Sequence, residues 1–390
     1  MVPYPKSISP DELAGLTTEV DGLCLRSGPK VPAEVLSDNL QFISVFGVGI
    51  DHITRIGKVG TDERGADERG IPIFNASSHE NTRAVAELVV GSVFSLLRSM
   101  HEHNRQMHGD MKVGTWTKTN GQEVRGKTLG ILGYGAVGSQ ASELAEKLNM
   151  KVIYYDKAST LRRGNAKSSK SVEEVLANSD IVSLHMPGGE ENHHIIDAEK
   201  LAMMQEGGYL INAARADLVE YDALIEALES GHLAGAAIDV YTDEDYTEPS
   251  KRGDKFEHPL VAHPQVLLLP HIGGSAIEAQ SEIGENVALK SVAYLATGTT
   301  TGSVNMPHKD LGELAPGTSR LINIHDNQPG ALADAAKVIA ENGLNVIDTA
   351  QGVKDGIGFL AFDVEGTIPE PVVEAIRAEK AVRRLRVLNR

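Results

Sequence analysis

The 390-residue sequence contains one cysteine, Cys24, and no apolar run approaching the roughly 18 residues that a membrane-spanning helix needs. A lone cysteine excludes a disulfide framework and a cysteine-based zinc site. The first residues include no apolar segment of the kind found in a secretory signal. We therefore expect a soluble protein of the cytoplasm with no membrane partner.

Positive charge is also scarce, because 37 Lys and Arg stand against 54 Asp and Glu, for a formal net charge of −17. Proteins that bind nucleic acid carry a basic surface, so this balance excludes nucleic acid as a partner. An anionic substrate would need a site that concentrates the few cations locally. With 41% apolar and 23% charged residues the composition is that of a globular chain. Its length predicts two or three domains.

Short apolar runs alternate with helical patterns along most of the chain. This alternation predicts βαβ units and an α/β fold, with a mainly parallel sheet covered by helices on both faces. Long helical patterns at 81–105 and 275–297 flank the central block, so we expect that block to be inserted into another domain. The expected strands are 22–25, 41–46, 128–133, 151–156, 181–185, 208–212, 235–240 and 266–270.

The C-terminal part of the chain has a different pattern. Residues 298–319 are rich in Gly, Pro, Ser and Thr, as is typical of a linker. The order that follows is βαββαβ, which predicts a ferredoxin-like domain. A domain this small is more often regulatory, or used for assembly, than catalytic. Its expected elements are strand 320–325, helix 330–342, strands 346–351 and 357–364, helix 370–378 and strand 382–388.

A glycine-rich turn, Gly133-x-Gly135-x-x-Gly138, lies between an apolar strand pattern and a helical one. In a dinucleotide site the first glycine permits the tight turn, and the second lets the backbone approach the pyrophosphate. The third lets the helix pack close to its strand, and the helix N-terminus stabilises the diphosphate charge. The competing interpretation is a turn without a cofactor, but the accompanying strand, helix and acid favour a dinucleotide.

The strand after this helix ends at Asp156. A carboxylate at this position accepts hydrogen bonds from the adenosine ribose hydroxyls and repels a 2′-phosphate, which predicts NAD as the cofactor. Arg162 and Arg163 follow nearby and leave NADP open as an alternative.

Three predicted strand ends carry polar residues, where open α/β sheets bind ligands. Arg215 follows one strand, Asp239 and Glu244 follow the next, and His271 follows the last. An arginine can bind a carboxylate through two parallel hydrogen bonds, and a histidine can accept or donate a proton near neutral pH. A carboxylate that bonds to the histidine fixes its tautomer. Each residue alone could be a surface ion pair or a strand cap, but beside a nicotinamide they predict hydride transfer on an α-hydroxy acid.

Several segments resemble the D-isomer-specific 2-hydroxyacid dehydrogenases, and the last of them resembles the start of an ACT domain. The likeness runs from about residue 5 to the end of the chain. The segments are NTRAVAEL at 81–88, GKTLGILGYG at 126–135, VSLHMP at 182–187, LINAAR at 210–215, GAAIDV at 235–240, PHIGGS at 270–275 and IHDNQPG at 324–330.

The resemblance implies a Rossmann-like, doubly wound parallel sheet inserted in a flavodoxin-like substrate domain, plus a ferredoxin-like ACT domain. The implied boundaries are 1–80 with 277–300 for the discontinuous substrate-binding domain, 81–276 for the NAD-binding domain, 301–317 for a linker and 318–390 for the ACT regulatory domain.

The resemblance also implies roles at the cofactor. The catalytic triad would be Arg215, Glu244 and His271, with Asp243 as the neighbour most easily mistaken for Glu244. Asp239 would hold the nicotinamide carboxamide. The remaining cofactor contacts would be Ala136 and Val137 at the pyrophosphate and Ala213, Ala214, Ile272, Gly273 and Gly274 at the nicotinamide end.

The implied substrate is 3-phosphoglycerate, whose oxidation to 3-phosphohydroxypyruvate begins serine synthesis, and 2-oxoglutarate could be a side substrate for reduction. Arg26 and Ser27 would hold the phosphate, and Gly49 and Asp51 would lie near the carboxylate. Lys6, Lys30 and Lys118 are weaker candidates. The alternatives are another dehydrogenase for hydroxypyruvate, glycerate or 2-hydroxyglutarate, an NAD-sensing corepressor, and an inactive serine sensor.

In the ACT domain the resemblance places L-serine, as an effector, at His325, Asn327 and Asn345. The competing interpretation is that the two asparagines cap turns. ACT sheets of this kind pair edge to edge, so we expect a homotetramer formed through the ACT and NAD-binding domains. Histidines 101, 103 and 108 lack ligand spacing, so no metal site is expected.

Four features depart from the family, and two of them are Ala216-Asp217 after the catalytic arginine and Asp245 after Glu244. We also expect the N-terminal region to be shorter than is usual in the family, by about one strand and one helix of the substrate domain. An unusual insertion covers 58–66, where Asp-Glu-Arg-Gly occurs at 62–65 and again at 67–70. We expect this repeat to be charged and solvated, with no chemistry of its own.

Overall fold

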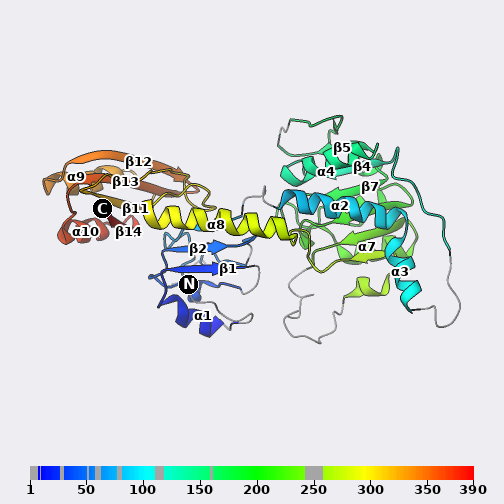
Figure 1. Cartoon of the computed structure of the whole chain (residues 1–390), viewed down its shortest axis with the longest axis horizontal. Coiled ribbons are helices and arrows are strands. Elements are labelled where there is room, and N and C mark those ends of the chain that lie inside the picture. The colour runs from blue at the N-terminus through cyan, green and yellow to red at the C-terminus, as the bar shows by residue number, and fades with distance from the viewer. Residues whose placement is uncertain are drawn as a thin grey trace. The chain divides into compact units, whose positions relative to one another are not determined.

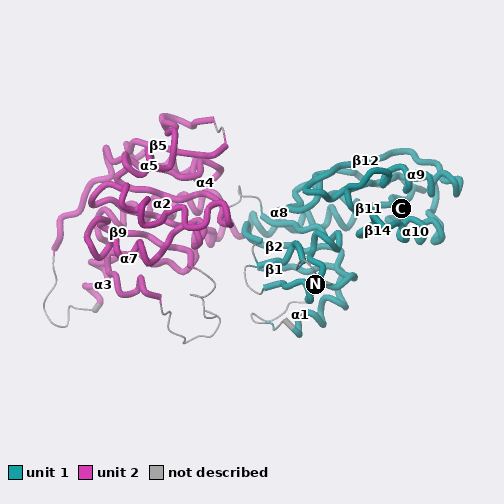
Figure 2. Tube along the Cα trace, turned by 180° about the vertical axis from the view of Figure 1, so that it is seen from behind, with its two compact units in different colours: residues 1–77, 281–390 teal, residues 78–280 magenta. Residues whose placement is uncertain are grey.

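The computed structural model describes residues 8, 10–26, 30–50, 52–57, 63–76, 81–109, 118–158, 161–241 and 258–390. The chain divides into two compact units (Figure 2), one made of Met1–Ser77 with Ser281–Arg390 and the other of Ser78–Gln280. Each unit has its own sheets and its own hydrophobic clusters.

The unit of residues 78–280 contains a seven-stranded sheet in which all neighbouring strands are parallel. The strand order reverses at β4, which lies between β7 and β5. Such a reversal opens a crevice at the carboxyl ends of the strands, where ligands bind. In spatial order the strands are β10 (Val266–Leu268), β9 (Leu233–Ile238), β8 (Gly208–Asn212), β7 (Ile181–Leu184), β4 (Thr128–Leu132), β5 (Lys151–Tyr155) and β6 (Lys167–Ser168).

Helices cover both faces of this sheet (Figure 1), as predicted. In β4, Ile131 packs in the cluster on one face and its neighbour Leu132 in the cluster on the other. Burial on both faces explains why the strands are almost continuous apolar runs. One face is covered by α2 (Thr82–Leu97) and α4 (Ala136–Lys147), and the other by α5 (Val172–Ala177), α6 (Ala198–Ala202) and α7 (Tyr221–Glu229).

The single helix predicted over 81–105 is wrong at one point, because α2 ends and α3 (Met100–Gly109) begins after it. Ser99, between them, has a φ of 46°. This left-handed conformation cannot continue a right-handed helix. Among the described residues no single helix is long and apolar enough to cross a membrane. The two helices α2 and α3 meet those criteria only when taken together, and they are bent by 68°.

The first part of the other unit is a three-stranded parallel sheet, ordered β1-β2-β3. Strand β3 was not predicted, since only three of its residues pair with β2. The elements are α1 (Pro10–Thr17), β1 (Gly22–Leu25), the short 3₁₀ helix η1 (Ala33–Val35), β2 (Phe42–Val45) and β3 (Ile73–Asn75). Helix α8 (Ile277–Thr297) packs Tyr294 against Phe74, with ring centroids 5.7 Å apart.

The C-terminal part is a four-stranded antiparallel sheet ordered β12-β13-β11-β14, which confirms the predicted ferredoxin-like domain. Its helices pack on one face of the sheet. Met306 and Leu311, from the segment predicted as a linker, pack on the other face. The elements are β11 (Thr318–Asp326), α9 (Ala331–Glu341), β12 (Val346–Lys354), β13 (Ile357–Glu365), α10 (Glu370–Arg377) and β14 (Val382–Asn389).

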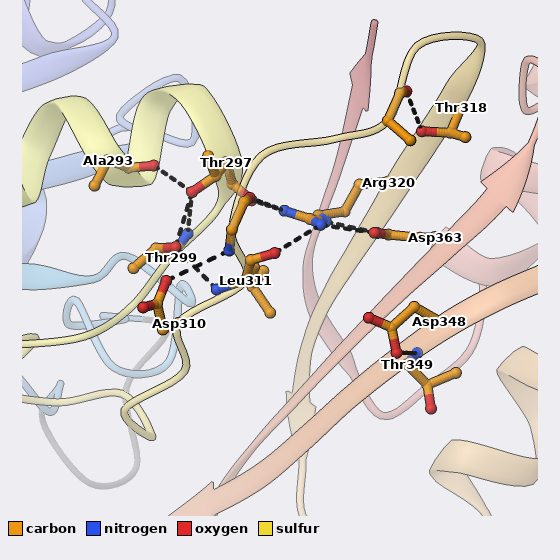
Figure 3. Close-up of polar contacts among 12 residues, drawn as sticks. Ala293, Thr297, Thr299, Asp310, Leu311, Thr318, Arg320, Asp348, Thr349 and Asp363 are labelled. Carbon is orange, nitrogen blue, oxygen red and sulfur yellow. Dashed lines mark hydrogen bonds and ion pairs between the residues drawn. The ribbon is translucent and has the colours of Figure 1, made fainter.

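Arg320 of β11 connects this sheet to the end of α8 (Figure 3). The residue as a whole is 2% exposed. Nε and Nη2 donate to the two carboxylate oxygens of Asp363 at 2.6 and 2.7 Å. Nη1 donates to the carbonyls of Thr297 and Gly312, and Nη2 donates also to that of Leu311, at 2.7–3.0 Å. One guanidinium therefore satisfies three backbone carbonyls and a buried carboxylate with all five of its N–H groups.

The second Asp-Glu-Arg-Gly copy is not solvated, which corrects our prediction. Asp67 is 5% exposed and accepts hydrogen bonds from Arg55 Nη2 at 2.8 Å and Asn305 Nδ2 at 2.7 Å. The carbonyls of Asp67 and Arg69 each accept a bond, at 2.9 Å, from Arg383 and Arg384 of β14. The charged sequence of the repeat suggested exposure to solvent. In the structure, however, the backbone of the second copy accepts hydrogen bonds from β14 of the C-terminal sheet.

Candidate active site

The glycine turn lies between β4 and α4. Gly133 has a φ of 92°, and a Cβ on it would lie 2.7 Å from the carbonyl of His185. A Cβ on Gly138 would lie 2.2 Å from the carbonyl of Gly133. A Cβ on Gly135, the N-cap of α4, would have no atom of the described structure within 4 Å. No side chain caps this helix. The turn thus leaves open space next to the backbone at Gly135 and next to the N–H groups of the first turn of α4. A pyrophosphate could bind in that space and accept hydrogen bonds from those groups.

Asp156 follows β5 and faces this turn. Its Oδ2 accepts a hydrogen bond from Tyr134 N at 2.6 Å, and Oδ1 accepts one from Ala158 N at 2.8 Å. Each carboxylate oxygen has further acceptor capacity for ribose hydroxyls. Arg163 pairs instead with Glu143 at 3.1 Å. Arg163 is one of the two arginines that kept NADP as an alternative cofactor, and this ion pair already occupies it.

Asn212, the last residue of β8, organises the loop that carries Arg215. It is fully buried; its Nδ2 donates to Arg215 O at 2.9 Å, and its Oδ1 accepts from Ala214 N at 3.1 Å. The Arg215 guanidinium in turn donates to Ala214 O at 2.8 Å. Our sequence reasoning did not single out Asn212 as a functional residue. The signal available was an asparagine directly after a buried strand, where it can bond to the following backbone.

Asp239, after β9, holds the loop that carries His271. It is 2% exposed, and its oxygens accept hydrogen bonds from Ile272 N and Gly273 N, both at 2.8 Å. Burial raises the pKa of Asp239, and these backbone bonds and His271 oppose the rise. In this structure the carboxylate therefore orients a neighbouring loop. Its predicted bond to a nicotinamide carboxamide stays a prediction.

The same loop packs against the start of α2. A Cβ on Gly274 would lie 3.0 Å from Asn81 Nδ2, and Gln280 Nε2 donates to Gly274 O at 2.7 Å. The sequence did not reveal the contact of Asn81 with Gly274, because the two residues lie far apart in the chain and meet only after folding. Gln280 lies six residues from Gly274, and its bond to that carbonyl was not predicted either.

His271 has a φ of 55°, a conformation that residues other than glycine adopt at a cost of about 1–3 kcal/mol. Although the residue keeps surface exposure, burial lowers the pKa of its imidazole below the ordinary 6.5. The charge of Asp239 raises that pKa, and that of Arg215 lowers it. The arginine and the acid, from two different strand ends, thus lie within electrostatic reach of one imidazole.

Several predicted residues are not placed with this group. Glu244 and its neighbour Asp243, together with Ser27 and Asp51, lie outside the described residues. Arg26 and Gly49 are described and belong to the unit of residues 1–77 and 281–390. Within the described part of the chain, no group of three or more His, Cys, Asp and Glu residues could hold a metal ion.

The three predicted effector residues do not meet within one chain. His325 pairs across the sheet with Gly358, near the start of β13, and Asn327 N donates to Gly356 O at 3.0 Å. Asn345 instead donates from Nδ2 to Glu365, at the end of β13, at 2.9 Å. His325 and Asn327 therefore lie at one end of the four-stranded sheet and Asn345 at the other.

A doubly wound sheet with a glycine turn at its switch point, and with Arg215, Asp239 and His271 at its strand ends, defines a nicotinamide-dependent dehydrogenase. Residues 90–273 match the family model of the D-isomer specific 2-hydroxyacid dehydrogenase NAD-binding domain, and residues 321–382 match the ACT domain. The chain belongs to the D-3-phosphoglycerate dehydrogenase family of these NAD-dependent oxidoreductases, on the relatives that follow.

It is 40% identical over 389 residues to the D-3-phosphoglycerate dehydrogenase of Haemophilus influenzae, covering 99% of this chain and 90% of that protein. It is 39% identical over 370 residues to that of Escherichia coli K12, covering 93% and 86%. Among solved structures, D-2-hydroxyisocaproate dehydrogenase matches with a TM-score of 0.64 at 28% identity, covering 76% of this chain and 90% of that one. The NAD-dependent formate dehydrogenase of Staphylococcus aureus, solved with NAD, matches with a TM-score of 0.60 at 28% identity, covering 73% and 82%. The prediction of NAD is confirmed.

Proposed function

We propose that this protein oxidises D-3-phosphoglycerate to 3-phosphohydroxypyruvate with NAD, the first step of L-serine synthesis. The observation that carries the proposal is that Arg215, Asp239 and His271 gather at the carboxyl ends of strands in the sheet that also carries the dinucleotide turn. The relatives that share nearly the full length of the chain carry the name of this activity.

His271 acts as the base in this proposal. Because burial lowers the pKa of the imidazole, it is neutral at pH 7 and can take the C2 hydroxyl proton. Bound NAD supplies the acceptor for the hydride that leaves C2. In the reverse direction His271 returns the proton to the carbonyl oxygen. Glu244 has the role of holding the imidazole in its tautomer.

Arg215 binds the substrate carboxylate and stabilises charge that develops on the C2 oxygen. Asn212 fixes the backbone from which this arginine projects, so it is a positioning residue. In the proposal Arg26 and Ser27 have the role of holding the phosphate, and Gly49 and Asp51 have the role of binding the substrate near its carboxylate. Reduction of 2-oxoglutarate is part of the same proposal, because that acid also has an α-oxo carboxylate and a distal anion.

L-Serine is the proposed effector, bound by His325 and Asn327 of one chain and Asn345 of a second. The separation of these residues along the sheet supports an effector site made from two copies. Strand β12 forms one edge of this sheet and is largely exposed, as pairing of two sheets requires. The predicted homotetramer and the cytoplasmic location belong to this proposal.

The test is NADH formation with D-3-phosphoglycerate, compared with lactate, glycerate and 2-hydroxyglutarate, with and without L-serine. We expect the phosphorylated acid to have the highest kcat/KM and serine to inhibit its oxidation. Turnover of unphosphorylated acids alone would contradict the proposed substrate. Full activity in saturating serine would contradict the effector. His271→Ala should bind NADH and lack turnover.

A further inference from the structure

A polar cavity of about 380 Å³ lies where three parts of one unit meet. It is lined by the turn after α1, the turn before β2, Tyr294 of α8 and strand β14. The volume suits a small metabolite. The cavity is separate from the dinucleotide turn, which belongs to the other unit, and none of the predicted effector residues lines it.

One wall of the cavity is cationic and is contributed by Arg384 and Arg386 of β14. Arg386 donates to the carbonyls of Tyr294 and Leu295 at 2.8 and 2.6 Å, and its guanidinium lies 5.0 Å from the Tyr294 ring centre. Arg384 donates from Nε and Nη1 to the carbonyls of Arg69 and Asp38. Its Nη2 has no hydrogen-bond partner among the described residues, so this group has donors to offer a ligand.

The lining of the cavity is also anionic. Glu19, Asp21 and Asp38 all line it. Asp38 is already paired with Arg69 at 2.6 Å, which leaves Glu19 and Asp21 as the lining acids without an ion pair in the described part of the chain. The cavity is thus lined by charges of both signs.

Gln41, which also lines the cavity, has a hydrogen-bond acceptor without a donor. Its Nε2 donates to Asp21 Oδ1 at 2.9 Å. Its Oε1 is buried and has no hydrogen-bond partner in the described structure. A buried acceptor without a partner costs about 1–3 kcal/mol, which a donor from a ligand would recover once the Gln41 side chain turns this oxygen toward the cavity that it lines.

We propose that this cavity is a second effector site, which binds a small α-amino acid as a zwitterion. The ligand carboxylate pairs with Arg384, and its ammonium group lies between Asp21 and Gln41 Oε1. A simple anion would be repelled by the acids and a simple cation by the arginines, so a molecule with both charges matches the lining better than either. Because β14 and the turn before β2 both line the cavity, the bound ligand contacts both elements, in addition to the bond that Arg384 donates to Asp38 O.

The experiment is calorimetric titration of the full-length protein with glycine, L-alanine and L-serine, compared with acetate and methylamine as singly charged controls. Asp21→Asn and Gln41→Met remove the partners of the ammonium group with little change in volume. Each is expected to weaken amino-acid binding by about tenfold, the equivalent of 1.4 kcal/mol. Gln205→Met changes an exposed glutamine outside the cavity and is expected to bind like the original protein.

Asn345→Ala separates this site from the proposed serine site at the sheet ends, because it should leave glycine and alanine binding unchanged. The proposal is overturned if no zwitterion binds, if acetate or methylamine binds equally well, or if both cavity variants bind as tightly as the original protein. Melting temperatures without ligand show whether each variant is folded. If one is not, the other variant and the comparison of charge types decide.

Discussion

Arg320 and Asp363 form a two-point ion pair inside the four-stranded sheet, with side chains 3% and 14% exposed. The same guanidinium bonds to the carbonyl of Thr297, the last residue of α8. The pair therefore connects the interior of the C-terminal domain to the helix that begins soon after the His271 loop.

Replacing Arg320 by Met should be strongly destabilising, because it leaves the Asp363 carboxylate and three backbone carbonyls without partners. We expect the free energy of unfolding to fall by about 3–5 kcal/mol, the usual cost of breaking a buried ion pair on one side. Chemical denaturation measures this. Arg125→Ala is the control, since its pair with Glu123 is 73% and 75% exposed and should contribute less than about 1 kcal/mol. Equal effects of the two substitutions would contradict the role of Arg320.

The acid limb of the pH profile for oxidation should lie below the ordinary histidine pKa of 6.5, because burial lowers the pKa of His271 and the base must be neutral. Asp239→Asn removes a negative charge that raises this pKa. The imidazole then stays neutral to lower pH, so the acid limb of kcat/KM should move further down. Initial rates between pH 5 and 9 measure it, and an upward movement of the limb would show that another group controls the rate.

Asn212→Ala should reduce catalysis more than stability. Loss of the bonds to Ala214 N and Arg215 O costs about 1–3 kcal/mol of stability. Displacement of Arg215 should lower kcat/KM on the order of 10²-fold. Asn178→Ala is the control, because that exposed side chain also bonds to one backbone carbonyl but lies away from the strand ends. A rate loss that is no larger than for the control would exclude a positioning role.

Gly135→Ala should fold normally and bind NADH poorly. Nothing in the described structure lies within 4 Å of the added Cβ, so the melting temperature should barely change. The methyl group would occupy space that the pyrophosphate needs, and we expect roughly tenfold weaker NADH binding, or about 1.4 kcal/mol. Gly284→Ala in α8 also has open space and should not affect NADH binding. Unchanged affinity in Gly135→Ala would show that the cofactor does not approach this backbone.

The class of fold could be predicted because it depends on local patterns. Strands such as 181–185 and 208–212 are short, mostly apolar runs, and the structure has β7 and β8 there. The break at Ser99 could not be predicted, because the residues around it favour a helix and only one backbone angle interrupts it. Strand β3 is three residues long and depends on its pairing with β2, which a local pattern does not reveal.

The site was only partly predictable, because some of its contacts join residues that are distant in the sequence. Arg215 and His271 stood out because their chemistry is specific and they follow apolar strands. Asn81 contacts a segment far from it in the chain, and nothing in its own neighbourhood distinguishes it from an ordinary turn residue. Asn212 bonds to residues two and three positions further on, so its place at the end of a buried strand was the one signal available. Asp67 was predicted to be solvated, since burial of a charge depends on partners such as Asn305, which is 238 residues away in sequence.

His325 and Asn345 lie at opposite ends of β13, so an effector site that uses both residues depends on the concentration of the protein. An effector site built from two copies exists only at concentrations at which the copies associate, and the effector in turn favours association. If serine binds at the two-copy site proposed above, sensitivity to serine should therefore fall on dilution while turnover per active site persists. Feedback of this kind would report the abundance of the enzyme as well as that of its end product.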